Sequence, residues 1–144
     1  MSKDYLEINL HSVNDNVKFE GAARQNQPIS VDYFPPIGSG EGYTSLELLM
    51  ISFTSCISST LLTVLRAFKH KNVISLKAGT KGFVREEHPK ALTEMQLELT
   101  FLTPDAEQED IESALALAEN KLCPVWAMLK GNVKITVSYS IEKQ

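Results

Sequence analysis

The stretch at residues 46–68, LELLMISFTSCISSTLLTVLRAF, decides the fold. Apolar residues recur around the whole circumference of a helix of this sequence, and Thr44 or Ser45 is a suitable N-cap. Glu47 falls in the first turn, where the helix dipole favours a carboxylate. The pattern predicts one long helix of about 40 Å, at ~1.5 Å per residue, ending near the basic residues 69–71. A helix this apolar must be buried in protein.

The same stretch is the one part of the chain that could pass for a membrane span. It contains Glu47 and Arg66 together with many hydroxyl side chains, namely Ser52, Thr54, Ser55, Ser58, Ser59, Thr60 and Thr63. A membrane span should be mostly apolar over ~20 residues. We therefore expect a core helix and no membrane partner.

Shorter elements surround this helix in the sequence. Before it, alternating apolar residues predict strands at residues 5–10, 17–22 and 29–33, followed by a proline- and glycine-rich loop. After it, the pattern predicts strands at 73–85 and 92–102, a helix at 107–122, a further turn at 125–129 and a strand at 133–141. The predicted order is βββ-α-ββ-α-β, in a single α+β domain over residues 1–144.

Composition excludes several classes of function. The chain has a net charge of −4 with scattered lysines and arginines, which argues against a nucleic-acid partner. No apolar leader follows Met1, and the cysteines are only two, so we expect a reducing, cytoplasmic compartment with both thiols free. The three histidines lie far apart and form no ligand-spaced pair with a cysteine, so we predict no metal and no cofactor.

Cys56 lies inside the long helix, on a face that it shares with small hydroxyl residues such as Ser52, Ser59 and Thr60. Such a stripe could be a seam against another helix, or it could line a cleft polar enough for a thiolate. It could also be plain core, with each hydroxyl bonded to the preceding turn. The residues alone leave all three readings open.

Cys123 precedes Pro124, and a proline at the first helical position makes the residue before it a candidate cap. Free backbone N–H groups there would lower the pKa of the thiol and make it a better leaving group. The alternative is a simple helix kink with a buried cysteine. Trp126 and Met128, close by, are either core or interface residues or the walls of a binding site.

Taken together, these residues resemble the OsmC/Ohr family of thiol-dependent peroxidases. The resemblance rests on Gly40-x-Gly42-x-x-Ser45-x-Glu47-Leu48-Leu49, on Ser52 and Ser55-Cys56, and on Cys123-Pro124-Val125. It implies an intertwined homodimer, in which the sheets of both subunits wrap around two long central helices. It also implies that Cys56 reduces an organic hydroperoxide, that Cys123 resolves the product as a disulfide, and that a dithiol reductant restores the pair.

The resemblance implies further site residues, and the sequence departs from it in two places. Strong peroxidases of the family have a proline where this chain has Ser45 and a catalytic carboxylate where it has Leu46. Glu47 matches the next position, as in the OsmC-like branch. The family's thiolate-stabilising arginine comes from the N-terminal strands, where the chain offers Arg24.

Two other functions fit the same pair of cysteines. One is a non-catalytic dimer that binds a small apolar ligand between Phe53, Trp126 and Met128. The other is a redox sensor in which a Cys56–Cys123 bond reports oxidation without turnover. A structural relative with inert cysteines is the remaining alternative.

Overall fold

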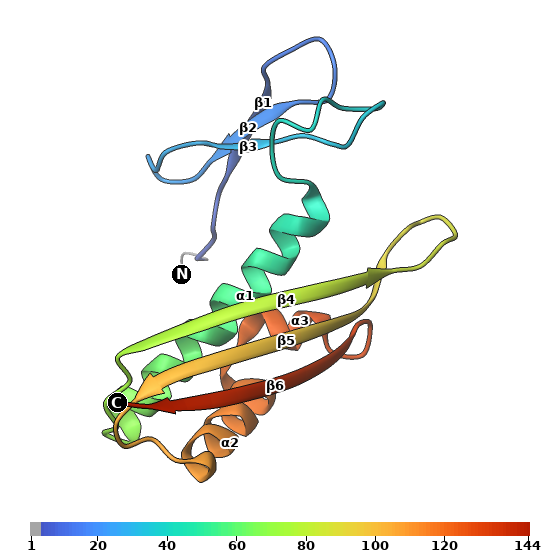
Figure 1. The fold of residues 1–144 in the computed structure, drawn as a ribbon. Coiled ribbons are helices and arrows are strands. Elements are labelled where there is room, and N and C mark those ends of the chain that lie inside the picture. Colours follow the sequence, from blue (N-terminus) through green and yellow to red (C-terminus); the bar gives the residue numbers. More distant parts are fainter. Residues whose placement is uncertain (1–3) are drawn as a thin grey trace. The chain divides into compact units, whose positions relative to one another are not determined.

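The computed structural model describes residues 4–144 and divides the chain into two compact units, Met1–Leu49 and Met50–Gln144. Figure 1 shows a small three-stranded sheet in the first unit and a second sheet with its helices in the other. The expected single domain over residues 1–144 stays a prediction. The elements follow in the predicted order, with one extra short helix at the predicted turn.

The N-terminal unit is an antiparallel sheet of β1 (Asn9–Ser12), β2 (Phe19–Ala22) and β3 (Ile29–Val31) in that order. The predicted first strand, residues 5–10, starts too early. β2 pairs with β1 from Asn9 onward and then enters a turn, so residues 5–8 have no partner strand among residues 4–144. They are extended and exposed, Leu6 by 99%.

The loop after β3 is built around the buried carboxylate of Asp32. This carboxylate accepts backbone N–H groups of Tyr33 at 2.7 Å, Ser39 at 3.2 Å and Glu41 at 3.1 Å. The N–H of Glu41, with those of Tyr33 and Ser39, lowers the pKa of Asp32 from its ordinary value, although burial opposes the shift. The loop is thereby held in one shape as it enters the long helix.

The long helix α1 (Ser45–Thr63) begins with a capping box. The side chain of Glu47 accepts the N–H of Thr44 at 2.8 Å, and the Thr44 hydroxyl accepts the N–H of Glu47 at 3.2 Å. Of the two predicted N-caps, Thr44 is therefore the one used.

The predicted helix does extend to Phe68, but its last turn is not α-helical. A π-helical turn, η1 (Val64–Phe68), follows α1 and is closed by the N–H of Lys69 on the Val64 carbonyl. By length and composition alone, Ser45–Phe68 could cross a membrane. Phe53, Ile57 and Leu61 are nevertheless fully buried inside the chain, so one side of this helix belongs to the core.

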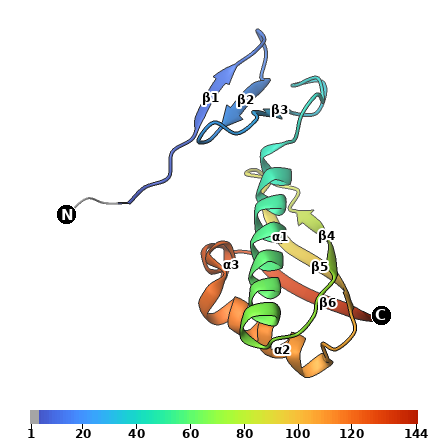
Figure 2. The same ribbon diagram turned by 90° about the vertical axis from the view of Figure 1, so that its left-hand side faces the viewer.

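The C-terminal unit is a sheet with helices on one face (Figure 2). The sheet has the order β4 (Ser75–Val84), β5 (Leu92–Thr103), β6 (Lys134–Lys143), with β4 antiparallel and β6 parallel to β5. Alternate residues of β5 are buried against the helices, namely Met95, Leu97, Leu99 and Phe101. Residues between them, such as Glu94 and Glu98, are on the other face.

Between β5 and β6 the chain forms three helical segments. They are α2 (Gln108–Leu117), the π-helical turn η2 (Ala118–Leu122) and the short helix α3 (Pro124–Leu129). The last of these is the predicted turn after Pro124. The mixed α+β class and the order βββ-α-ββ-α-β are thus confirmed.

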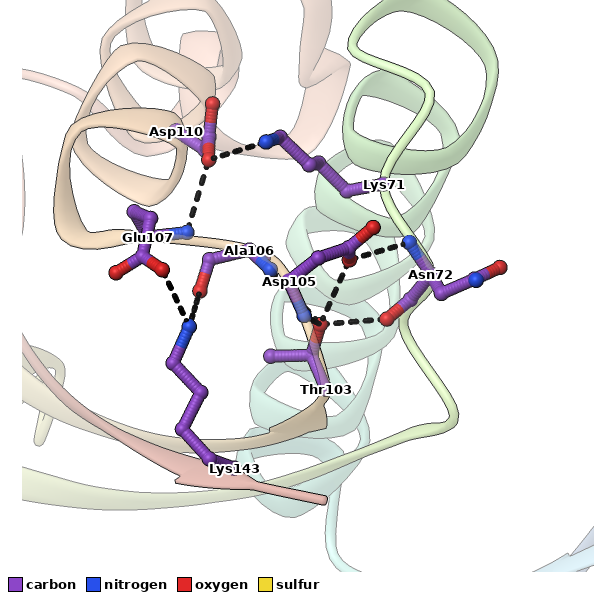
Figure 3. A network of polar contacts seen from close by, with 8 residues as sticks. All are labelled: Lys71, Asn72, Thr103, Asp105, Ala106, Glu107, Asp110 and Lys143. Atoms are coloured by element: carbon purple, nitrogen blue, oxygen red, sulfur yellow. Dashed lines mark hydrogen bonds and ion pairs between the residues drawn. The ribbon is translucent and has the colours of Figure 1, made fainter.

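A polar network fixes the start of α2 (Figure 3). The fully buried Thr103 hydroxyl donates to the Asn72 carbonyl and accepts the N–H of Ala106 at 3.1 Å. The ammonium of Lys143 donates to the Ala106 carbonyl at 3.0 Å and to Glu107 at 2.6 Å. Because these bonds tie the end of β5 to β6, they set the point from which α2 runs.

Gly38 provides a test of the Asp32 loop. A Cβ on Gly38 would collide with the Tyr33 carbonyl and the Asp32 carboxylate, which cannot move without breaking the loop. We expect Gly38→Ala to destabilise the protein by at least about 2 kcal/mol in urea unfolding. Gly79→Ala is the matched control, because a Cβ there meets nothing within 4 Å. Equal urea midpoints for the two variants would contradict the conclusion that the Asp32 loop is rigid.

Candidate active site

The sulfur atoms of Cys56 and Cys123 lie 3.2 Å apart in the C-terminal unit, although the two residues are far apart in sequence. Both thiols are free. Cys56 is half-buried on α1, and Cys123, between η2 and α3, is only 2% exposed. The two sulfurs are about 1 Å farther apart than in a disulfide, so a small movement would join them.

The hydroxyl residues that follow Cys56 on α1 bond to its backbone. The Ser59 hydroxyl donates to the Cys56 carbonyl at 3.1 Å, and the Thr60 hydroxyl donates to the same oxygen at 2.8 Å. This is the back-bonding expected of plain helix residues. These two hydroxyls therefore need no hydrogen-bond partner outside the helix. Their small side chains form a polar surface beside the Cys56 thiol.

Cys123 is held at a junction between two helical segments. Its N–H closes η2 on the Ala118 carbonyl at 2.9 Å, and its own carbonyl accepts the N–H of Ala127 at 3.1 Å. Pro124 occupies the first position of α3, so Cys123 is the N-cap, as predicted. The backbone thus fixes the thiol from both sides.

The expected low pKa of Cys123 is wrong. Burial raises the pKa of the Cys123 thiol to about 11, more than the backbone N–H groups of Trp126 and Val125 lower it. The neighbouring Cys56 raises this pKa further, because Cys123 donates its S–H to the Cys56 sulfur. At neutral pH the Cys123 thiol is therefore protonated and acts as a donor, and the sulfur of Cys56 is its acceptor.

The comparison with protein families now decides the identity of the fold. The family model described as OsmC-like protein matches residues 38–138, which include both cysteines. The chain belongs to the OsmC-like family. No curated protein matches it in sequence.

Solved structures similar to this OsmC-like chain share its fold along nearly its whole length. A hypothetical protein from Aquifex aeolicus VF5 is 25% identical with a TM-score of 0.85, covering 99% of each chain. An OsmC-like protein from Mycoplasma pneumoniae is 18% identical with a TM-score of 0.80, covering 97% of this chain and 99% of its own. An organic hydroperoxide resistance protein OsmC from Legionella pneumophila is 16% identical with a TM-score of 0.70, and the same shares are covered.

The three residues predicted to form the walls of a binding site differ in how far they are buried in the OsmC-like structure. Phe53 is fully buried and packs edge-on against Trp126, with ring centroids 5.9 Å apart. Met128, in contrast, is 69% exposed. Phe53 and Trp126 therefore pack against each other inside the chain, whereas the Met128 side chain is exposed.

The remaining predicted site residues belong to the N-terminal unit. Arg24 is exposed in the tight turn after β2, where its φ of 64° is left-handed. Glu47 is engaged in the capping box of α1, which is the role that its place in the first turn predicted. The residues that the structure brings together are Cys56 and Cys123. Within residues 4–144, no three His, Cys, Asp or Glu residues cluster as metal ligands would.

The sequence did not predict a hollow on the C-terminal unit. It has a volume of about 230 Å³ and is lined by Ser59, Thr60, Thr63, Val64, Phe68 and Leu122. Leu122 directly precedes Cys123, while the other five residues follow Cys56 on α1 and η1. No local motif marks such a place, because its walls come from two separate helical segments.

The raised pKa of Cys123 predicts how the two thiols react with iodoacetamide. In the Cys56→Ser variant we expect Cys123 to react slowly at pH 7 and to accelerate only well above neutral pH, because burial, the largest cause of its raised pKa, remains and the thiolate is the nucleophile. Mass spectrometry of the peptides at several pH values measures this. The Cys123→Ser variant is the control for Cys56, and a Cys123 rate that levels off below pH 9 would contradict the assignment.

Proposed function

We propose that this OsmC-like protein is a two-cysteine peroxidase that reduces organic hydroperoxides. The observation that carries the proposal is the 3.2 Å separation of the Cys56 and Cys123 sulfurs. A pair this close can pass between dithiol and disulfide without unfolding. Further support comes from the family and from similar structures that are named as organic hydroperoxide resistance proteins.

Cys56 is the attacking thiol in this proposal. It is the more accessible of the two residues, and its sulfur accepts the S–H of the protonated Cys123. The thiolate attacks the terminal oxygen of the hydroperoxide and breaks the O–O bond. Cys56 becomes a sulfenic acid, and the alkoxide takes a proton to leave as the alcohol.

Cys123 is the resolving thiol. Its sulfur attacks the sulfenic sulfur of Cys56, the disulfide forms, and the thiol proton leaves with the hydroxyl as water. The backbone N–H groups of Val125 and Trp126 favour the Cys123 thiolate at this step. A dithiol reductant then restores both thiols by exchange, as expected in the cytoplasm.

Five other residues have proposed roles. Arg24 is assigned as the cation beside the Cys56 thiolate, on the family resemblance rather than on a contact. Glu47 acts through α1, which it caps. Phe53 and Trp126 support the sulfurs from below, and Met128 is exposed for a ligand or a second subunit.

The peroxidase proposal predicts distinct phenotypes for the two cysteines. With cumene hydroperoxide and dithiothreitol, Cys56→Ser should lose at least about 99% of turnover, because no nucleophile remains. Cys123→Ser should still consume one peroxide per Cys56 in a single-turnover experiment, which leaves a sulfenic acid that dimedone traps. Wild-type turnover no greater than that of Cys56→Ser would refute the proposal. A disulfide formed without turnover would instead indicate a sensor.

We also propose that the protein is a homodimer that joins along α1. Ser52, Ser55, Ser59 and Thr63 lie on one exposed face of this apolar helix. The hydroxyls of Ser55, Ser59 and Thr63 donate within the helix, to the carbonyls of Ser52, Cys56 and Ser59 respectively. A face of small, internally satisfied side chains lets a second helix approach closely. Exposed apolar residues flank it, including Ile51 and Phe68.

The dimer proposal predicts a mass in solution of twice the 16.0 kDa of the chain. Ser55→Arg places a long charged side chain on the proposed seam, so light scattering at micromolar concentration should show a shift toward monomer. Ser113→Arg, at an exposed helical serine of α2, is the control and should keep the wild-type mass. A monomeric wild-type protein would refute the dimer.

A further inference from the structure

The two cysteine sulfurs are spaced to share a single bridging atom. Cys56 and Cys123 are the only cysteines of the chain, both are free, and their sulfurs lie 3.2 Å apart. At this separation the two bonds of an atom that binds both sulfurs at ~2.3 Å, the length of a zinc–sulfur bond, meet at ~90°. With the same bond length a tetrahedral metal needs the sulfurs ~3.8 Å apart, and a linear ion needs ~4.6 Å. The observed separation therefore favours an atom whose bonds meet near a right angle.

The number of ligands narrows the choice of that atom. Among residues 4–144, no third His, Cys, Asp or Glu joins the two cysteines to form a metal site. Zinc sites take three or four ligands from the protein, so two thiols do not suffice. Trivalent arsenic is soft and prefers sulfur, and its lone pair makes it pyramidal, with bond angles close to a right angle. An arsenic atom that already carries one organic group needs only two more bonds.

We infer that the reduced pair binds a monosubstituted trivalent arsenical, which Cys56 and Cys123 close into a ring. In the reaction with an arsine oxide, the S–H bonds of both thiols and the arsenic–oxygen bond break, and two arsenic–sulfur bonds form. The oxygen leaves with the two protons as water, and no atom is oxidised or reduced. The inference requires the two free thiols and does not require the peroxidase reaction.

Burial favours this product over a bound ion. Cys123 is only 2% exposed, and a charge held beside it would need a compensating partner. The ring of arsenic and two sulfurs is neutral. Cys56 is half-buried, so the arsenical enters from its side, and Cys123 then closes the second bond within the same molecule. Such an intramolecular second bond should tighten binding at least about 100-fold over a single thiol.

Phenylarsine oxide is the probe, added to the reduced protein in the absence of dithiols. Intact mass should show one phenylarsenic group per chain, and Tm should rise by at least about 5 °C because the folded state already pairs the sulfurs. Excess 2-mercaptoethanol should leave the adduct in place, whereas 2,3-dimercaptopropanol should remove it. Zn²⁺ at the same concentration should not compete. Trp126, the only tryptophan, lies one turn after Cys123, so its fluorescence should follow each titration.

The variants separate a paired site from two independent thiols. Cys56→Ser and Cys123→Ser should each bind at least about 100-fold more weakly and release the arsenical to 2-mercaptoethanol. The matched control combines Cys123→Ser with Ser113→Cys, which restores the number of thiols at an exposed position of α2. This control should bind as weakly as Cys123→Ser. Wild-type protein oxidised to the disulfide should form no adduct, and this test needs no substitution.

Single-turnover consumption of cumene hydroperoxide, measured without reductant, tests the peroxidase separately. If wild type binds one phenylarsenic group but consumes no peroxide, the peroxidase function fails and the arsenical site stands. If peroxide is consumed but the arsenical binds no more tightly than it does to Cys123→Ser, the inference is overturned and the peroxidase stands. Displacement of the arsenical by Zn²⁺, or equal binding by the matched control, also overturns the inference.

Discussion

The C-terminal unit depends on the burial of one stripe of α1 against alternate residues of β5. Phe53, Ile57, Leu61 and Leu65 recur every four residues on the helix and are fully buried, as are Met95, Leu97, Leu99 and Phe101 on the strand. Each such side chain contributes roughly 1.5–3 kcal/mol when it is fully removed from water. The rotation of α1 about its axis is thereby fixed, and with it the direction of Cys56.

The position of the Cys123 sulfur depends on several successive contacts. Thr103 and Lys143 fix the beginning of α2 at the end of the sheet, and Ile111 and Ala114 bury one face of that helix. The π-turn η2 and Pro124 then end this helix, and the Cys123 side chain points at Cys56 on α1. The contact between the sulfurs is thus a consequence of how two helices pack on one sheet.

Much of this architecture could be predicted from the sequence, because it follows from periodicity. Alternation identified β5, and proline after Cys123 identified the break before α3. The start of β1 could not be predicted, since the alternation of residues 5–8 is real but pairing depends on a partner strand. The π-turn η1 could not be predicted either, because one extra residue hardly disturbs the pattern of a stretch as apolar as residues 61–68. The hollow beside the cysteines was missed because its walls come from two separate helical segments.

The pKa of Cys123 shows where local reasoning about a site fails and what the failure means chemically. The cap position correctly placed backbone N–H groups near the thiol, but burial outweighs them and raises its pKa to about 11. In the proposed peroxidase, the protonated Cys123 donates its S–H to the Cys56 sulfur before the peroxide arrives. This matters in a chain with Leu46 at the position of the expected acid, because the resolving thiol itself supplies a hydrogen bond to the nucleophile. After Cys56 is oxidised, the same N–H groups favour loss of the Cys123 proton. One residue can therefore serve first as donor and then as nucleophile, with no change in the fold between the two steps.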